Sequence, residues 1–195
     1  MKVVIIKYNA GNIRSVLFAL ERIGVNAIVT DDHNEIRSAD RVIFPGVGEA
    51  SSAMQYLREK RLDTLICSLV QPVLGICLGM QLMCTHSEEN NTNCLGIFDQ
   101  KVKLFPSAGF KVPQIGWNNI TNIKSNLFKG IAENAYMYFV HSYYVESCEN
   151  AIAETDYIQK YSSAVCKNNF YAVQFHPEKS GEFGQKILEN FINEI

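Results

Sequence analysis

A chain of 195 residues, of which 47% are hydrophobic and 19% charged, has the size and composition of one ordinary folded domain. Its 18 basic and 20 acidic residues give a net charge of −2, which excludes the broad basic surface that nucleic acid requires. The six cysteines form no C-x-x-C pair and no zinc-like cluster with the four histidines. We therefore expect no metal and no cofactor, and a location in the reducing cytoplasm.

The first half of the chain alternates short apolar runs with helical periodicity. Strands are expected at residues 3–6, 27–29, 41–44 and 73–76, and helices at residues 13–23 and after residue 48 up to residue 58. Apolar strands that alternate with helices are typical of a mainly parallel sheet covered by helices on both faces.

An uncharged stretch at residues 64–85 is, at 22 residues, long enough to cross a bilayer as a helix. Gln71 and Pro72 fall in its middle, and Gly75 and Gly79 lower its helix propensity. We interpret the stretch as a helix, a break, a short buried strand and a second helix, and we expect no membrane span.

After about residue 100 the pattern changes to short strands rich in aromatic and β-branched residues, which we expect to be antiparallel. These strands are expected at residues 101–105, 136–140, 152–155, 163–167 and 170–175. Asn168 and Asn169 suit a two-residue hairpin turn, and residues 183–195 have the spacing of a helix that packs on the sheet. Because no linker separates the two halves, we expect one domain over residues 1–195.

Gly75-Ile76-Cys77-Leu78-Gly79 stands where an expected strand meets an expected helix, and it has the G-x-nucleophile-x-G form of a nucleophile elbow. The two glycines let strand and helix approach closely, and a helix N-terminus favours the reactive thiolate. The motif predicts that Cys77 is a catalytic nucleophile. The alternative is a buried core cysteine, which is how we interpret the other five.

A base and an orienting group for this nucleophile are offered by His176 and Glu178, which follow the apolar run at residues 172–175. In an extended segment, side chains two residues apart point to the same side, and Pro177 disfavours a helical conformation at the histidine. Catalytic groups of α/β sheets gather at the C-terminal ends of strands. We therefore predict that Glu178 orients His176, which faces Cys77. The alternative is a loop histidine beside a solvated glutamate.

Acyl transfer also needs donors for the developing oxyanion. The backbone N–H of Leu78, directly after the nucleophile, is one candidate. Residues 45–48 contain two glycines that make their peptides easy to reorient, so the N–H of Val47 or Gly48 is another; the alternative is an ordinary strand-to-helix turn. Gln81 lies one helical turn beyond the nucleophile, where its amide can hydrogen-bond a polar substrate.

Together these residues resemble the class I, triad-type glutamine amidotransferases, and the resemblance covers essentially all 195 residues. The matching segments are residues 11–15, 45–48, 77–81, 115–118, 139–143 and 174–181. Within the family, Met80 and the Gly116-Trp117-Asn118 segment are most similar to glutaminase subunits that act in histidine biosynthesis. The resemblance implies a flavodoxin-like α/β fold with a mainly parallel central sheet flanked by helices and additional antiparallel strands in the C-terminal half.

The resemblance implies an activity as well. Cys77 would attack the side-chain amide of L-glutamine, His176 would shuttle protons, Glu178 would orient His176, and water would release glutamate from the thioester. The glutamine would be held by Gly48, Gln81, Glu89, Ser142 and Tyr143. Glu89 would lie near the substrate ammonium group, and a solvated helix end is the alternative for it.

The resemblance further implies that ammonia passes to a separate cyclase subunit, a (β/α)8 barrel, in a heterodimer. The interface would involve Asn12, Ser15, Trp117, Tyr138 and Lys179. No part of the sequence suggests a phosphosugar site, and free ammonia would be protonated in open water, so the second substrate is expected on a docked partner.

Two segments depart from the family pattern: Tyr8-Asn9-Ala10, which lacks the usual glycine, and Pro113-Gln114-Ile115, which lacks the usual histidine. Both are expected near the partner face. They leave open a duplicated subunit that feeds another synthase, such as one that forms amidino sugars. A free-standing cysteine hydrolase and a non-catalytic binding subunit with a vestigial triad are further alternatives.

Overall fold

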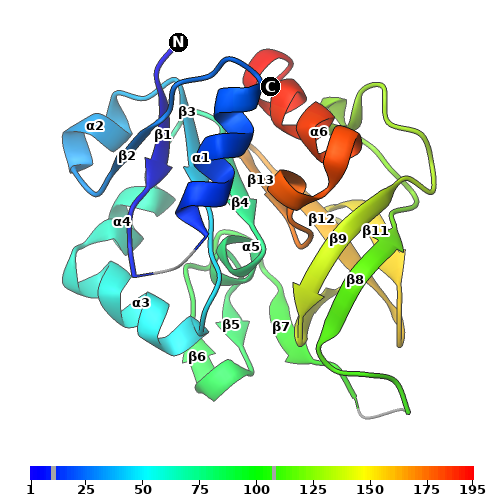
Figure 1. The fold of residues 1–195 in the computed structure, drawn as a ribbon. Helices are drawn as coiled ribbons and strands as arrows, with labels where there is room; N and C mark the ends of the chain where they lie inside the picture. The colour runs from blue at the N-terminus through cyan, green and yellow to red at the C-terminus, as the bar shows by residue number, and fades with distance from the viewer. Residues whose placement is uncertain (10–11, 107–108) are drawn as a thin grey trace.

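The computed structural model of the chain describes residues 1–9, 12–106 and 109–195 (Figure 1). Ala10 and Gly11, named above in the first loop, lie outside these ranges. The helices are α1 (Ile13–Arg22), α2 (His33–Arg37), α3 (Ala50–Glu59), α4 (Leu62–Cys67), α5 (Leu78–Leu82) and α6 (Gly181–Asn193), with short 3-10 helices η1 (Glu89–Asn91), η2 (Asn126–Phe128) and η3 (Pro177–Lys179). The strands are β1 (Val3–Ile6), β2 (Ile28–Thr30), β3 (Arg41–Phe44), β4 (Val73–Ile76), β5 (His86–Ser87), β6 (Thr92–Asn93), β7 (Lys101–Leu104), β8 (Gln114–Asn119), β9 (Tyr136–His141), β10 (Tyr143–Glu146), β11 (Ala151–Asp156), β12 (Lys160–Lys167) and β13 (Phe170–Val173).

The parallel half of the large sheet has the strand order β2-β1-β3-β4-β13. This is the flavodoxin-like order, which confirms the predicted fold class. Val3 and Ile5 of β1 pack into a core with α1 and α6, whereas Val4 and Ile6 pack into a second core with α2, α3 and α4 (Figure 1). Helices therefore cover both faces of the sheet, and every residue of β1 is buried, as the apolar run predicts.

The expectation that all the later strands are antiparallel is wrong for β13. This strand runs antiparallel to β12 on one side and parallel to β4 on the other. The hairpin turn was predicted correctly: Asn168 has a φ of 55°, and the turn sets the antiparallel pairing with β12. The other edge of β13 completes the parallel sheet, a pairing between residues distant in sequence that strand composition does not reveal.

Strand β9 also differs from expectation, because it leaves the main sheet and pairs antiparallel with β8 in a separate two-stranded ribbon. The sequence analysis predicted β9 but not β8. Gly116 has a φ of 132°, and Asn118 and Asn119 are residues more common in turns, so strand propensity alone does not detect β8. The ribbon lies beside the C-terminal helix α6 (Figure 1).

The uncharged stretch at residues 64–85 is divided among α4, β4 and α5, as predicted. Within the described parts of the chain, no helix combines the length and the apolar character needed to cross a membrane.

Helix α5, which follows β4, approaches the neighbouring strand β3 very closely at Gly79. A Cβ atom at this position would lie 2.0 Å from the carbonyl oxygen of Phe44. No side chain fits there, so the glycine that follows Cys77 by two residues is required by packing.

Gly79→Ala is expected to lower the free energy of unfolding by about 3 kcal/mol, because the added methyl group collides with rigid backbone. Gly24→Ala is the matched control: Gly24 has a φ of 78° but open space around it, so the change adds conformational strain of about 1 kcal/mol without a collision. Urea unfolding of both variants measures the difference. Equal losses would contradict the steric explanation.

Candidate active site

Cys77 occupies the turn between β4 and α5 in a strained conformation, with φ 54° and ψ −109°. Its backbone N–H donates to the carbonyl oxygen of Val173 at 2.8 Å, which ties the turn to β13. Gly75 allows this approach, because a Cβ there would lie 3.2 Å from the Cβ of Ala172. A strained residue at a strand-to-helix turn is the geometry that a nucleophile elbow requires.

A cavity of about 320 Å³ opens above this turn, at the C-terminal ends of the parallel strands. Its lining residues are Val47, Gly48, Cys77, Leu78, Gln81, Glu89, Pro113, Val140, His141, Ser142, Tyr143, His176 and Lys179. Every predicted oxyanion and glutamine-binding residue is among them. Pro113, Val140 and His141 were not predicted as site residues, although residue 140 and residue 141 belong to a segment that carries the family resemblance.

The side chains predicted to form a triad lie close to one another. The Nδ1 atom of His176 lies 2.7 Å from the Oε1 atom of Glu178, and both side chains are buried. His176 has an extended backbone, as predicted, but Glu178 belongs to the 3-10 helix η3 that begins at Pro177. The carboxylate therefore reaches the imidazole from a tight turn and not from an extended strand.

The surroundings of His176 act on its pKa in opposite directions. Burial lowers the pKa, whereas hydrogen bonds with the Cys77 thiol and the Glu178 carboxylate, together with their negative charges, raise it more. The net result is a pKa raised from 6.5 to about 10. The imidazole is therefore well suited to accept the Cys77 proton and hold it.

Asn12 was expected at the partner face, and the structure places it against the triad. Its Nδ2 atom donates to the Oε1 atom of Glu178, the same oxygen that contacts His176. The Oε2 atom of Glu178 is buried and has no hydrogen-bond partner among the described residues. Among the described residues, Asn12 is thus the side chain outside the His176–Glu178 pair that supports the carboxylate.

The oxyanion candidates are not all free to act. The backbone N–H of Leu78 donates to the carbonyl oxygen of Gly46 at 3.2 Å, so this donor is already occupied by the loop at residues 45–48. The loop is anchored by Tyr8, whose buried hydroxyl donates to the carbonyl oxygen of Pro45 at 2.6 Å. Burial and the nearby Cys77 charge raise the pKa of Tyr8, which keeps the hydroxyl a donor. In this arrangement the Leu78 N–H cannot bind an oxyanion.

Gln81 is nearly fully buried at the floor of the cavity. Its Nε2 atom donates to the carbonyl oxygen of Tyr143 and to the Oε1 atom of Gln174, each at 3.0 Å. Because an amide nitrogen has two hydrogens, both donors are used, and only the Oε1 atom of Gln81 remains to meet a substrate.

Glu89 does not lie at a solvated helix end. It lines the cavity, and its Oε2 atom accepts from the backbone N–H of Ala50 at 2.8 Å. Burial raises the pKa of Glu89, the hydrogen bond from Ala50 lowers it, and the charge of Glu49 raises it further. A half-buried carboxylate in this position can pair with a substrate cation.

His141 has an environment opposite to that of His176. Burial lowers the pKa of His141 to about 4, and the hydrogen bond to the carbonyl oxygen of Tyr143 only partly offsets this. The cavity therefore contains one histidine that is neutral and one that readily carries a proton, a separation typical of acid–base sites.

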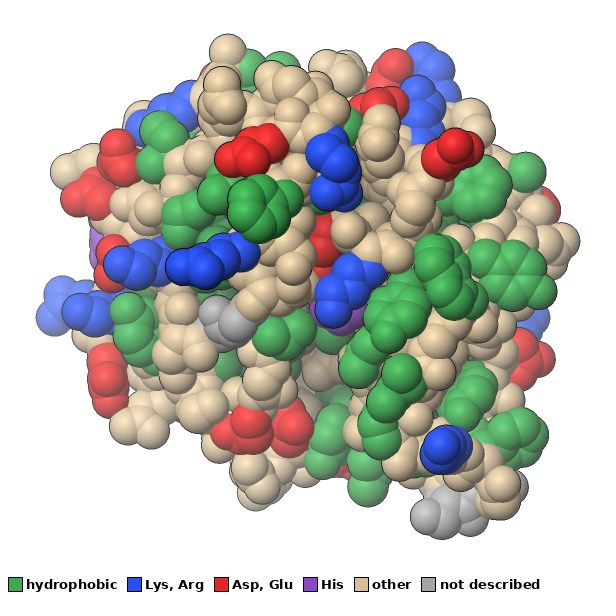
Figure 2. Space-filling model, viewed as in Figure 1, with side chains coloured by type: hydrophobic (Ala, Val, Ile, Leu, Met, Phe, Trp, Pro, Cys, Tyr) green, Lys and Arg blue, Asp and Glu red, His purple; other side chains and the backbone are tan. Residues whose placement is uncertain are grey.

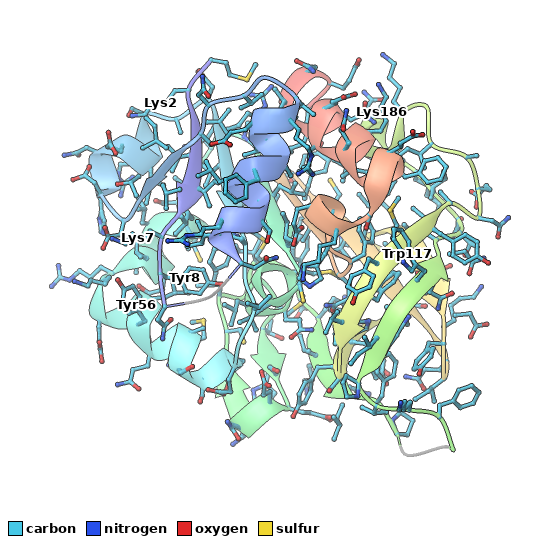
Figure 3. The ribbon with its side chains drawn as sticks, in the orientation of Figure 1. Lys2, Lys7, Tyr8, Tyr56, Trp117 and Lys186 are labelled. Carbon is cyan, nitrogen blue, oxygen red and sulfur yellow. The ribbon has the colours of Figure 1, made fainter. Side chains whose placement is uncertain are left out.

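The other predicted interface residues lie around the cavity rim and on the β8–β9 ribbon. Trp117 is 56% exposed and its ring packs edge-on against Tyr138, with 5.9 Å between ring centroids. The Nζ atom of Lys179 lies 5.9 Å from the centre of the Tyr138 ring. Figure 2 shows hydrophobic side chains gathered over the ribbon, and Figure 3 shows Trp117 on it. The remaining predicted interface residue, Ser15, is a half-buried residue of α1.

Comparison with known proteins agrees with this geometry. The family model of class-I glutamine amidotransferases matches residues 4–195, and the chain belongs to this family. It is 59% identical to the imidazole glycerol phosphate synthase subunit HisH of Bacteroides fragilis over 194 residues, which are 98% of this chain and 99% of that protein. It is 46% identical to the subunit of the same name from Haemophilus influenzae over 196 residues, 100% of this chain and 98% of that protein.

Solved structures share the fold at low sequence identity. The chain superposes on a structure described as a glutamine amidotransferase with a TM-score of 0.74 at 18% identity, covering 96% of this chain and 98% of that one. It superposes on PurLQS from Thermotoga maritima with a TM-score of 0.74 at 16% identity, covering 99% and 98%.

Glu178→Gln is expected to lower the pKa of His176 from about 10 by about 1–3 units, because the change removes the carboxylate charge that favours the imidazolium. Nitrogen-15 NMR titration of the imidazole measures this directly. Since folding raises this pKa, the protonated imidazole stabilises the fold fully below pH 6.5, and the stabilisation is lost as the pH rises towards 10. The free energy of unfolding should therefore fall less steeply over this pH range in the variant, and identical slopes would refute the assignment.

Proposed function

We propose that the protein is the glutaminase subunit of an imidazole glycerol phosphate synthase, acting in histidine biosynthesis in the cytoplasm. It hydrolyses L-glutamine to glutamate and ammonia and delivers the ammonia to a cyclase subunit. The observation that carries the proposal is that Cys77 and His176 line one cavity and that His176 contacts Glu178, in a chain that matches the relatives named above over nearly its whole length. Residues 1–195 act as one glutamine amidotransferase domain.

The chemistry begins with proton transfer. His176 takes the proton from the Sγ atom of Cys77, and the thiolate attacks the side-chain amide carbon of glutamine. The resulting tetrahedral intermediate collapses when the imidazolium gives its proton to the amide nitrogen, so ammonia leaves and a thioester remains. Water, deprotonated by His176, then attacks the thioester and releases glutamate and the thiol. Glu178 keeps the imidazole in the orientation that both steps need.

The glutamine lies between two ends of the cavity. Its ammonium group pairs with Glu89, which faces the cavity from η1, and its side-chain amide points to Cys77. Ser142 and Tyr143 line the wall between them, and Gln81 accepts a hydrogen bond through its Oε1 atom. The ammonium group and the side-chain amide of the substrate thus each have a partner of complementary charge or hydrogen-bonding type.

The occupied oxyanion donor supports activity that depends on a partner. While the Gly46 carbonyl accepts from the N–H of Leu78, it occupies the place where an oxyanion needs that donor. Rotation of the peptide between Gly46 and Val47 removes this carbonyl and turns the Val47 N–H towards the site. Docking of the cyclase, a (β/α)8 barrel, promotes this rotation. A free-standing cysteine hydrolase would need the donor to be free in the isolated chain, so this alternative is less well supported.

The partner docks on the face formed by Trp117, Tyr138 and Lys179, with Asn12 and Ser15 at its edge. Exposed apolar side chains of this kind are enriched at protein interfaces, and the ribbon also exposes Ile115 and Tyr136. The face borders the cavity through Lys179, so ammonia released at Cys77 reaches the partner without crossing bulk water.

Cys77→Ala is expected to abolish glutamine-dependent synthesis by the complex, by about 10³-fold or more, because no other group in the cavity can form the thioester. Synthesis driven by added ammonium salt should be unchanged, which also shows that the variant folds and docks. Coupled assays of product formation with either nitrogen source measure both rates. A vestigial triad would predict that glutamine-dependent synthesis survives.

Trp117→Ala is expected to weaken binding of the cyclase by about 30-fold or more, because a large exposed aromatic at the centre of an interface is a typical hot spot. Val70→Ala is the matched control. Val70 is 87% exposed and precedes β4, so it lies near the N-terminal ends of the parallel strands, whereas the cavity lies at their C-terminal ends. Titration calorimetry with the histidine-pathway cyclase and with an amidino-sugar synthase compares the partners. Binding only to the latter would favour the duplicated-subunit alternative.

A further inference from the structure

We propose that Gln174 is a further catalytic residue, whose side-chain amide donates a hydrogen bond to the Sγ atom of Cys77 and stabilises it as a thiolate. This proposal rests on the proposed glutaminase function and adds a residue that contacts the nucleophile from outside the cavity. Gln174 belongs to the segment at residues 174–181 that resembles the amidotransferase family, but the sequence predicts no role for its side chain.

The contact is direct. The Nε2 atom of Gln174 lies 3.6 Å from the Sγ atom of Cys77, a distance typical of an N–H donor to sulfur. Gln174 is completely buried directly after β13, and its backbone N–H donates to the carbonyl oxygen of Ser163 at 2.8 Å. The side chain does not line the cavity, so it approaches the sulfur from the protein interior and leaves the substrate side open.

The direction of this hydrogen bond follows from the hydrogen bonds that Gln81 makes with Tyr143 and with Gln174. The carbonyl oxygen of Tyr143 can only accept, so the amide of Gln81 must turn its Nε2 atom towards it. The same Nε2 atom donates to Gln174, which must therefore present its Oε1 atom there. Gln174 then has only its NH₂ group to turn towards Cys77. Because the carbonyl oxygen of Tyr143 can only accept, the amide of Gln174 must be a donor to the sulfur of Cys77.

A fixed donor at this place favours one state of the nucleophile. A thiol sulfur is a weak acceptor, whereas a thiolate accepts a charge-assisted hydrogen bond. Besides His176, the sulfur has a further polar neighbour, the carbonyl oxygen of Val140 at 3.8 Å, which accepts from a thiol and repels a thiolate. Gln174 therefore opposes Val140, and it supports proton transfer from Cys77 to His176.

The same donor acts again when the thioester is hydrolysed. The tetrahedral intermediate then expels the sulfur, which regains a negative charge until His176 returns the proton. Because the Gln174 amide is held in place by Gln81, it needs no reorganisation when this charge appears. The residue thus stabilises the sulfur both as a nucleophile and as a leaving group.

Gln174→Glu tests the donor with almost no change in shape. Its carboxyl group keeps an oxygen for Gln81 but replaces the donor to Cys77 with an acceptor that carries negative charge. We expect kcat for glutamine-dependent synthesis by the complex to fall by about 10- to 100-fold. The pH midpoint for alkylation of Cys77 by iodoacetamide should rise by about one unit or more, which a merely structural role would not cause.

Gln174→Met provides a second variant of similar volume without charge. It removes both hydrogen bonds, and we expect the alkylation midpoint to shift in the same direction by a smaller amount. Gln71→Met is the matched control, because Gln71 donates to the carbonyl oxygen of Ile36 at 2.8 Å away from the cavity. This control should alter neither kcat nor the alkylation profile.

The outcomes separate this proposal from the function on which it rests. Alkylation of Cys77 needs no glutaminase activity, so its pH profile reports on Gln174 even if the complex proves to act on another amide. Unchanged midpoints and unchanged kcat in both Gln174 variants, with ammonia-dependent synthesis intact, would overturn the proposal. Absence of glutamine-dependent synthesis in the wild-type complex would instead overturn the proposed function.

Discussion

The site depends on the close contact between β4, α5 and the strands on either side. Gly79 has no room for a side chain and Gly75 has very little, and between them Cys77 adopts a positive φ at the end of the sheet. The backbone N–H of Cys77 is fixed on β13, the strand that leads to His176. One packing constraint therefore sets the position of Cys77, the proposed nucleophile, relative to His176, the proposed base, because β4 and β13, which lead to them, are neighbouring strands.

Much of this arrangement could be predicted from the sequence, and the exceptions have physical causes. The apolar runs at β1, β3 and β4 and the glycines around Cys77 act locally, so pattern and motif identify them. The parallel edge of β13 and the pairing of β8 with β9 depend on contacts between distant segments, and Gly116 conceals β8. Whether the Leu78 N–H is free or occupied depends on the orientation of the peptide between Gly46 and Val47, which the amino-acid composition of the loop does not determine.

The cavity separates two kinds of buried polar group. His176 is placed between a thiol and a carboxylate, so it gains a proton easily, whereas His141 meets only a carbonyl and a phenol and stays neutral. The amides of Gln81 and Gln174 carry no charge but have a fixed direction of donation. In the proposed mechanism, proton transfer is thus confined to one imidazole, and the amide dipoles around it do not compete for the proton.

The first loop contacts both parts of the machinery. Tyr8, at its start, anchors the oxyanion loop through Pro45, and Asn12, at its end, supports the carboxylate of Glu178. Asn12 contacts Glu178, which precedes Lys179 of the face on which we propose that the cyclase docks, whereas Tyr8 is buried. A partner that shifts this loop by a small amount would therefore act on the oxyanion donors and on the base together. Coupling of this kind would need no long pathway, because the hydrogen bonds of Tyr8 and Asn12 reach Pro45 and Glu178 on two sides of the site.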